Sequence, residues 1–321
     1  MNDTDKVYVA GHRGLVGSAV LRCLQACGYT NIATRSHGEL DLADQVAVAA
    51  FFTREKPKHV VLAAARVGGI LANATYPAEF IHVNLAIQTN VIHQCHLHGV
   101  ERLLFLGSSC IYPRDCPQPM MEEYLLTGRL ETTNSSYAVA KIAGIEMCHA
   151  YNRQYGTRYL CAMPTNLYGS GDNFDLHSSH VLPAMIRKFH EAKYSGEPVV
   201  LWGTGSPRRE FLHVDDLAEA CLYLMTLPVE KLSSLFNDHA PPLINVGCGE
   251  DITVKELAAV VANVVGYTGQ PEWDSSKPDG TPRKLLDSSR MRELGWKPKI
   301  SLRDGIESTY GWLKRSTGVN P

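Results

Sequence analysis

The sequence predicts an α/β protein built on a Rossmann-type doubly wound parallel sheet, with a smaller, discontinuous C-terminal lobe. In the first half, short apolar strands alternate with amphipathic helical stretches, and a glycine-rich turn joins the first strand to the first helix. Strand and helix in alternation imply right-handed crossovers, which give parallel strands with helices on both faces. After Asn166 the composition changes, and this change predicts the second lobe.

The elements of the first half follow from their apolar spacing. The expected strands are short apolar runs at Lys6–Ala10, Asn31–Thr34, His59–Ala64, Arg102–Gly107 and Tyr159–Pro164. The expected helices carry apolar residues on one face and lie at Val16–Cys27, Gln45–Glu55 and Phe80–His98, with a further helix containing Tyr137–Tyr155.

The second half is less regular. Segments rich in Gly, Ser, Pro and His alternate with shorter helical pieces at His180–Ala192 and Val254–Val265. The segments Phe211–Met225 and Leu243–Gly247 read as a helix and a strand that belong to the first sheet. We therefore expect one domain over residues 1–165, with returning segments around 210–247. A second lobe should span mainly residues 166–321, with a ligand between the two.

The composition limits the classes of function. A chain of 321 residues with 45% hydrophobic and 20% charged residues matches a soluble globular protein. Its net charge of −2 gives no electrostatic reason to expect a nucleic-acid or membrane partner. The polar N-terminus does not read as a signal peptide, and no run reaches the ~18 apolar residues of a membrane helix. Nine scattered cysteines without CxxC pairs favour free thiols in the cytoplasm over disulfides or a metal site.

The glycine-rich turn predicts a dinucleotide site. Gly11, Gly14 and Gly17 follow a strand and open a helix. Missing side chains permit a tight turn, close approach of a pyrophosphate and close packing of the helix on the strand. Free N–H groups at the helix N-terminus then face the anion. A glycine triplet alone is a weak signal, but in this strand-turn-helix context cofactor binding is favoured over a structural turn.

The residues after the second strand favour NADP over NAD. NAD enzymes usually carry a carboxylate there for the ribose 2′-hydroxyl, whereas this chain has Arg35 and His37. Arg35, together with Arg13 inside the glycine turn, could hold a 2′-phosphate by charge-assisted bonds. The alternative is that both arginines are solvated surface residues. Asp41 is placed to reach the adenine edge of the cofactor.

A serine, a tyrosine and a lysine predict the reaction centre. Ser108 ends an expected strand, and Tyr137 and Lys141 share one face of a helix because they are four residues apart. A nearby ammonium favours the phenolate, which would bring the phenol into the working range of an acid–base catalyst. Ser108 can hydrogen-bond the same substrate oxygen. Tyr-x-x-x-Lys alone usually marks a helix surface, but the glycine turn and Ser108 favour a nicotinamide-dependent enzyme acting on a carbonyl or alcohol.

The order of these motifs resembles the extended short-chain dehydrogenase/reductase superfamily. Six segments, which cover nearly the whole chain in order, narrow the resemblance to its GDP-L-fucose synthase family. They are the motifs at 107–113, 140–144, 163–169, 179–184, 209–216 and 277–284. The resemblance implies conversion of GDP-4-dehydro-6-deoxy-D-mannose to GDP-L-fucose, by epimerisation at C3 and C5 and reduction of the C4 ketone with NADPH.

The resemblance also implies site residues. Cys110 and His180 match the family's acid–base pair for epimerisation, and their unperturbed pKa values bracket neutral pH. Without the resemblance, Cys110 would be interpreted as a buried structural thiol. The implied cofactor contacts are Leu15, Val16, Leu42, Ala63, Ala65, Leu106, Gly107, Ser109, Lys141, Pro164, Asn166, Leu167 and His180, beside the residues already named.

Substrate-binding residues should come from the second lobe, because a diphosphate needs cations. The candidates are Lys188, Trp202, Arg209, Asp279 and Arg283. The first four fall at the family's substrate positions, whereas Arg283 is proposed from its charge alone. Lys188 replaces a frequent arginine, which keeps the attraction but loosens the geometry. For each basic residue taken alone, a role on the solvated surface is the favoured interpretation.

Two competing functions remain at this point. One is a nucleotide-sugar 4-epimerase or 4,6-dehydratase that retains NAD and needs no Cys/His pair. The other is a non-catalytic dinucleotide-binding sensor, which would not need Ser108, Tyr137 and Lys141 together. Related enzymes imply a homodimer formed through two helices per subunit, with helix Phe80–His98 and the helix carrying Tyr137 as candidates.

Overall fold

The structure is a computed structural model that describes residues 1–176, 178–277 and 279–316. Its centre is a six-stranded sheet of order β10-β5-β4-β3-β1-β2, in which every neighbouring pair is parallel. The strands are β1 (Val7–Ala10), β2 (Ile32–Ala33), β3 (His59–Leu62), β4 (Arg102–Leu106), β5 (Tyr159–Pro164) and β10 (Leu243–Val246). The order reverses between β1 and β3, and the crevice beyond such a reversal is where ligands bind in open α/β sheets.

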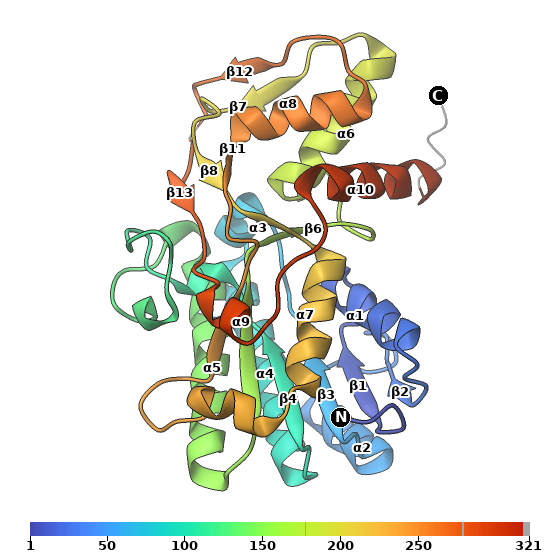
Figure 1. Ribbon diagram of the computed structural model, residues 1–321, viewed down its shortest axis with the longest axis vertical. Helices are drawn as coiled ribbons and strands as arrows, with labels where there is room; N and C mark the ends of the chain where they lie inside the picture. Colours follow the sequence, from blue (N-terminus) through green and yellow to red (C-terminus); the bar gives the residue numbers. More distant parts are fainter. Residues whose placement is uncertain (177, 278, 317–321) are drawn as a thin grey trace.

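Each face of this sheet packs on its own apolar cluster. Alternate residues of β1 point to opposite faces, Tyr8 and Ala10 into one cluster and Val7 and Val9 into the other. The first face is covered by α2 (Gln45–Glu55), α4 (Pro77–Leu97) and α5 (Ser135–Tyr155). The second face is covered by α1 (Leu15–Ala26), α7 (Val214–Thr226) and α9 (Ser289–Glu293) (Figure 1).

The predicted fold class is confirmed, although several boundaries differ. Helix α3 (Ile70–Thr75) was not expected, and α4 begins at Pro77 rather than Phe80 because proline is tolerated in a first helical turn. The expectation that Phe211–Met225 is one helix is wrong. Its first three residues form β9 (Phe211–His213), and β9 pairs with β6 (Asn166–Tyr168) outside the main sheet. Buried side chains at all three positions of β9 stabilise the extended segment.

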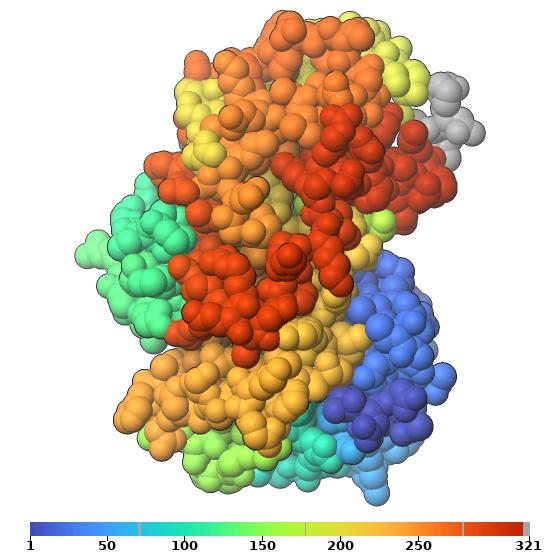
Figure 2. All heavy atoms as spheres, in the orientation of Figure 1, coloured from blue at the N-terminus to red at the C-terminus, as the bar shows by residue number. Residues whose placement is uncertain are grey.

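The second lobe has its own apolar core, formed largely by three helices. They are α6 (Val181–Ser195), α8 (Val254–Val265) and α10 (Leu302–Ser316). Its short strands are β7 (Val200–Trp202), β8 (Arg208–Arg209), β11 (Ile252–Thr253), β12 (Glu272–Asp274) and β13 (Arg283–Lys284). These pair as β11-β8-β13 and β12-β7. Figure 2 shows the C-terminal segment, in red, crossing the front of the molecule between the two lobes.

Short 3₁₀ helices occupy the connections. They are η1 (Ser109–Ile111), η2 (Glu122–Tyr124), η3 (Thr132–Asn134) and η4 (Val229–Leu235). Across the described ranges, no helix is both long and apolar enough to span a bilayer. The same residues contain no group of three or more His, Cys, Asp or Glu side chains that could hold a metal ion.

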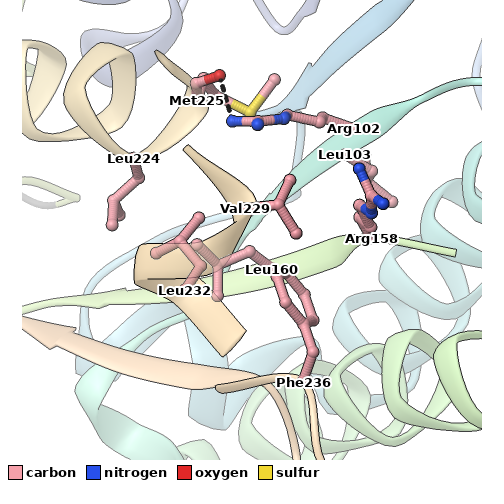
Figure 3. A pocket seen from close by; sticks show the side chains of 9 residues that line it. All are labelled: Arg102, Leu103, Arg158, Leu160, Leu224, Met225, Val229, Leu232 and Phe236. Carbon is pink, nitrogen blue, oxygen red and sulfur yellow. Dashed lines mark hydrogen bonds between the residues drawn. The ribbon is translucent and has the colours of Figure 1, made fainter. Parts of the chain in front are cut away.

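A small pocket lies at the amino-terminal ends of β4 and β5 (Figure 3). Arg102 closes it by donating to the carbonyl oxygens of Met225 and Leu227, 2.8 and 2.7 Å away, at the C-terminus of α7. Apolar side chains such as Leu160, Val229 and Leu232 form the rest of its wall. The predicted site residues lie after the opposite ends of these strands, so this pocket is not part of that site.

Candidate active site

The glycine turn is shaped for close approach. Gly11 has a φ of +86°, and a Cβ added there would lie 2.7 Å from the backbone nitrogen of Ala64. A Cβ added at Gly17 would lie 2.1 Å from the carbonyl oxygen of Gly11. Gly14 is the N-cap of α1, no side chain caps this helix, and its first turn contains no acidic residue. The turn therefore leaves an uncovered helix N-terminus, which fits the pyrophosphate of a dinucleotide.

The two arginines predicted for the 2′-phosphate differ in their surroundings. Arg35 forms an ion pair with Glu55 at 2.6 Å and donates to the carbonyl oxygen of Thr34, also at 2.6 Å. Arg13 is exposed, and within the described residues it makes no hydrogen bond or ion pair. Hydrogen bonds from Ser36, followed by the charges of Arg35 and Arg13, lower the pKa of Glu39, so both arginines face this segment. Arg13 is the freer cation of the two.

His37 and Asp41 face each other beside this segment. Nδ1 of His37 lies 3.8 Å from Oδ1 of Asp41, and both side chains are mostly exposed. Asp41 also accepts a hydrogen bond from the backbone nitrogen of Ala43 at 2.9 Å. Both side chains are therefore accessible from solvent.

Several of the other predicted cofactor residues have side chains that pack within the protein. Leu42 and Leu106 have buried side chains within the apolar core. Leu15, Val16 and Leu167 pack their side chains against the cluster beneath α1 and α7. The backbone nitrogen of Ala63 donates to Ala10 at 3.0 Å, and Nδ2 of Asn166 donates to the carbonyl oxygen of Glu210 at 2.7 Å. Gly107, Ser109 and Pro164 follow or end the central strands β4 and β5, whereas Ala65 follows β3.

The reaction-centre residues meet at the carboxyl end of β4. Ser108 is the N-cap of η1, and its Oγ accepts from the backbone nitrogen of Cys110 at 3.4 Å. Lys141 is buried on α5, and its Nζ donates to the carbonyl oxygen of Leu106 at 2.7 Å. The same Nζ lies 5.8 Å from the centroid of the Tyr137 ring. The structure therefore brings the predicted serine, tyrosine, lysine and cysteine together.

The expected depression of the Tyr137 pKa is not found. Burial, and then the nearby Cys110, raise the pKa of the phenol. The aromatic ring of Phe80 packs edge-on against Tyr137 with centroids 6.3 Å apart, which contributes to this dry environment. The phenol therefore remains protonated at neutral pH. That form can donate a proton to a substrate oxygen but cannot accept one.

Lys141 responds to burial in the opposite direction. Burial lowers its pKa to about 8, while the neighbouring Cys110 and Cys161 act in the opposite sense. The ring of Phe105 lies 4.7 Å from Nζ on the other side. Lys141 is therefore an ammonium at neutral pH that loses its charge in mildly alkaline solution.

His180 lies at the start of helix α6 in the second lobe. It is the N-cap of α6, its side chain is exposed, and the surrounding protein lowers its pKa by desolvation. A Cβ added at Gly69, just before α3, would lie 3.4 Å from the carbonyl oxygens of Ser178 and Ser179. Helix α3 also packs on η3, which directly precedes α5. The loop before His180 and the helix carrying Tyr137 are thus held by one connecting element.

Three predicted substrate residues of the second lobe are Trp202 on β7, Arg209 on β8 and Lys188 on α6. Trp202 is 65% exposed, and Nζ of Lys277 lies 5.7 Å from its ring centroid. Nζ of Lys188 donates to the carbonyl oxygen of Val200 at 2.9 Å, and desolvation lowers the pKa of Lys188. Desolvation also lowers the pKa of Arg209. An exposed aromatic face and two partly desolvated cations suit a nucleoside diphosphate.

Two of the predicted substrate residues are engaged within the protein. Arg283 forms an ion pair with Asp251, which also binds Arg208 at 2.6 Å. Asp279 accepts hydrogen bonds from the backbone nitrogen and the hydroxyl of Thr204 at 2.7 and 2.8 Å. Sequence reasoning could not find these pairs, because the partners are far apart along the chain.

Sequence reasoning also missed Lys284. Lys284 and Cys110 line the same recess, and the charge on Cys110 acts on the pKa of Lys284. The available signal was its position at the end of the motif 277–284, where Asp279 and Arg283 were interpreted as site residues but Lys284 was not.

The doubly wound sheet, the glycine turn and the Ser108–Tyr137–Lys141 group define a nicotinamide-dependent short-chain dehydrogenase/reductase. The chain belongs to the NAD dependent epimerase/dehydratase family, whose model matches residues 7–247.

Comparison with known proteins gives relatives over nearly the full length. The chain is 59% identical to GDP-L-fucose synthase 1 of Arabidopsis thaliana over 312 residues, which cover 97% of this chain and 94% of that protein. It is 54% identical to GDP-L-fucose synthase of Escherichia coli (strain K12) over 312 residues, or 96% of each chain. Identity at this level over the whole length extends the similarity to both lobes.

Solved structures are similar across both lobes as well. A GDP-6-OMe-4-keto-L-xylo-heptose reductase from C. jejuni matches with a TM-score of 0.93 at 40% identity, covering 99% of each chain. A GDP-L-fucose synthetase from Naegleria fowleri bound to NADP matches with a TM-score of 0.88 at 25% identity. That match covers 99% of this chain and 97% of the other.

Proposed function

We propose that this protein converts GDP-4-dehydro-6-deoxy-D-mannose to GDP-L-fucose, by epimerisation at C3 and C5 followed by NADPH-dependent reduction at C4. The observation that carries the proposal is the convergence of Ser108, Cys110, Tyr137 and Lys141 beyond the carboxyl end of β4. The full-length similarity to GDP-L-fucose synthases supports this substrate over those of the other nucleotide-sugar enzymes.

The crevice fits NADP(H). A side chain at Gly11 or Gly17 would clash with neighbouring backbone, so the turn stays bare. The uncapped N-terminus of α1 would face the pyrophosphate. Arg13 would hold the 2′-phosphate, with Arg35 nearby, and Lys141 would hold the nicotinamide ribose. When bound, the reduced nicotinamide supplies the hydride that a C4 ketone accepts. A structural neighbour bound to NADP supports the same assignment.

Tyr137 and Ser108 serve the reduction. Reduction of a ketone places negative charge on its oxygen, and that charge must be neutralised as it develops. Tyr137 carries the required proton, since burial keeps its phenol protonated. Ser108 donates a second hydrogen bond to the same oxygen, and the ammonium of Lys141 stabilises the phenolate that remains.

Cys110 and His180 serve the epimerisation. Inverting a carbon next to a ketone requires a base on one face and an acid on the other. Cys110 comes from the end of β4 and His180 from the start of α6, so the two groups approach from different lobes. The ketone makes the neighbouring C–H bonds acidic, and Ser108 and Tyr137 stabilise the enolate oxygen with hydrogen bonds.

The second lobe holds the nucleotide part of the substrate. Lys188 and Arg209 would neutralise the diphosphate, and the exposed ring of Trp202 would stack on the base or sugar. We propose residues 1–165 with the segments around 210–247 as the cofactor domain, and residues 166–321 as mainly the substrate lobe.

We also propose a homodimer formed through α4 and α5. The two helices pack against each other, and their outer surfaces expose Leu97, Val139 and Tyr155. A cytoplasmic location is supported by the nine cysteines, all of which are unpaired. Light scattering during size-exclusion chromatography tests the dimer, which a monomeric mass at micromolar concentration would exclude.

Turnover in D₂O tests the proposed function. The enzyme, NADPH and GDP-4-dehydro-6-deoxy-D-mannose should give product with deuterium at C3 and C5, because both carbons lose and regain a proton. The C4 hydrogen should come from NADPH and remain unlabelled. A product reduced at C4 without deuterium at C3 or C5 would limit the protein to a reductase.

A further inference from the structure

Cys110 lines a polar recess. It is lined by two segments, 109–131 and 281–284, which are far apart in sequence. Its charged and nucleophilic members are Cys110, Arg114, Glu131, Arg283 and Lys284. In Figure 1 the green segment after η1 and the segment carrying β13 lie side by side, as the hydrogen bonds between them require.

Backbone contacts on both sides fix Lys284 in this recess. Strand β13 is parallel to β8, with Lys284 paired to Arg209. The backbone nitrogen of Met120 donates to Leu285 at 2.7 Å, and Oε1 of Gln118 accepts from the nitrogen of Leu285 at 2.9 Å. The residue next to Lys284 is thus tied to the loop that follows Cys110. These contacts fix the backbone of Lys284 at the edge of the recess.

The charges of two lysines act on Cys110. Lys141 approaches from α5 and Lys284 from β13, and each counteracts the rise that burial causes in the pKa of the Cys110 thiol. Lys141 already donates to the carbonyl oxygen of Leu106. Within the described residues, Lys284 donates no hydrogen bond and forms no ion pair. Lys284 is therefore the cation that remains available to a thiolate at Cys110.

The other groups around Lys284 do not neutralise it. Burial lowers the pKa of Lys284 and Arg209 acts in the same direction, whereas Cys110, Glu131 and Cys116 raise it. The carboxylate of Glu131 is already held by Arg114 at 3.5 Å and by the backbone nitrogen of Thr133 at 3.3 Å. Arg209 repels the ammonium. Tyr137 is a further titratable neighbour of Cys110, and burial keeps its phenol neutral.

We propose that Lys284 is a positioning residue for the epimerisation, whose ammonium stabilises the thiolate of Cys110 across this recess. The inference rests on the proposed function. In the step it assists, the C–H bond next to the ketone breaks and an S–H bond forms, while the electron pair enters the enolate. The thiolate must exist before this step, and a buried thiolate requires a nearby positive charge.

Alkylation of Cys110 measures this effect without substrate. The full-length protein is treated with iodoacetamide at pH 6 to 10, and the rate at each cysteine is read by peptide mass spectrometry. Wild type is compared with Lys284→Met, Lys284→Arg and, as a matched control, Lys297→Met, whose exposed ammonium lies outside the recess. Exposed Cys27 serves as the internal reference in every sample.

Lys284→Met should slow alkylation of Cys110 on the order of tenfold at neutral pH, the change that one pKa unit gives. Its rate profile should move to higher pH and meet wild type at the alkaline end. Lys284→Arg should stay close to wild type, and Cys27 should react equally in all four proteins. An unchanged Cys110 rate would overturn the inference. A reduction by the same factor at every pH would also overturn it, because that result indicates altered access.

Exchange at C3 and C5 provides the second measurement. In Lys284→Met, the pH profile of deuterium incorporation into the substrate should move to higher pH, with KM changed much less than kcat. If wild type shows no exchange but the alkylation profile still shifts, the proposed function fails while the link between Lys284 and Cys110 stands. A normal exchange profile in Lys284→Met would reject the role of Lys284 in epimerisation.

Discussion

Lys141 lies with its Nζ 5.8 Å from the ring centroid of Tyr137 and 2.7 Å from the carbonyl oxygen of Leu106. The carbonyl fixes the ammonium beneath the phenol instead of leaving it free in solvent. Burial raises the pKa of Tyr137 and lowers that of Lys141. The pair therefore rests as a neutral phenol beside a cation, and the cation is ready to stabilise a phenolate once the proton has left.

Tyr137→Phe should abolish C4 reduction and leave NADPH binding nearly unchanged. The variant keeps the ring that packs on Phe80 but loses the donated proton. Loss of a general acid typically costs about 10²–10⁴-fold in rate. Single-turnover oxidation of NADPH measures the chemical step, and fluorescence titration measures the binding. Full turnover by the variant would remove Tyr137 from the mechanism.

The rate of reduction should fall as the pH rises through about 8, the pKa to which burial lowers Lys141. Below this value the ammonium is present and supports proton donation by Tyr137; above it the charge is lost. A pH profile of kcat/KM for reduction checks this limb. Lys141→Arg should retain activity at higher pH because guanidinium stays protonated. If kcat/KM fell at the same pH in both proteins, the fall would come from the titration of another group.

Arg13→Ala should weaken NADPH binding more than NADH binding, by on the order of tenfold or more, because charge-assisted bonds to a phosphate are strong. Arg35→Ala should have a smaller cofactor effect, since its guanidinium is engaged by Glu55 at 2.6 Å. Dissociation constants for both cofactors provide the test. An equal loss for NADPH and NADH would indicate that the 2′-phosphate is held elsewhere.

Cys110→Ser should slow deuterium exchange at C3 or C5 by about 10²-fold or more, because a serine hydroxyl is a far weaker acid than a thiol. Reduction of a substrate that needs no epimerisation should continue. NMR of the recovered nucleotide sugar gives the exchange rate at each carbon. Unchanged exchange at both carbons would leave Cys110 as a structural thiol.

Asp172→Asn should raise the melting temperature more at pH 8 than at pH 4. One carboxylate oxygen of Asp172 is buried without a hydrogen-bond partner, and burial raises its pKa to about 7. Its favourable contribution to folding is complete below the pKa of the unfolded chain and is lost as the pH rises through about 7. The expected gain at pH 8 is about 2–4 °C or more. Equal melting temperatures at pH 8 would show that the carboxylate is solvated.

Local patterns allowed much of the fold and the reaction centre to be predicted. The turn at Gly11, Gly14 and Gly17 and the helical spacing of Tyr137 and Lys141 need only their immediate sequence. Long-range pairing is what the sequence could not provide. The ion pair of Arg35 with Glu55 and the approach of Lys284 to Cys110 depend on how distant segments pack. The Tyr137 pKa was expected to fall because Lys141 was visible in the sequence, whereas the burial that dominates it was not.

The most direct test combines purified protein, NADPH and GDP-4-dehydro-6-deoxy-D-mannose, and follows nicotinamide absorbance together with the stereochemistry of the product. We expect one NADPH to be oxidised for each molecule formed, and the product to be GDP-L-fucose, inverted at both C3 and C5. Oxidation of NADPH that yields a sugar with C3 and C5 unchanged would contradict the account, as would a failure to oxidise NADPH at all.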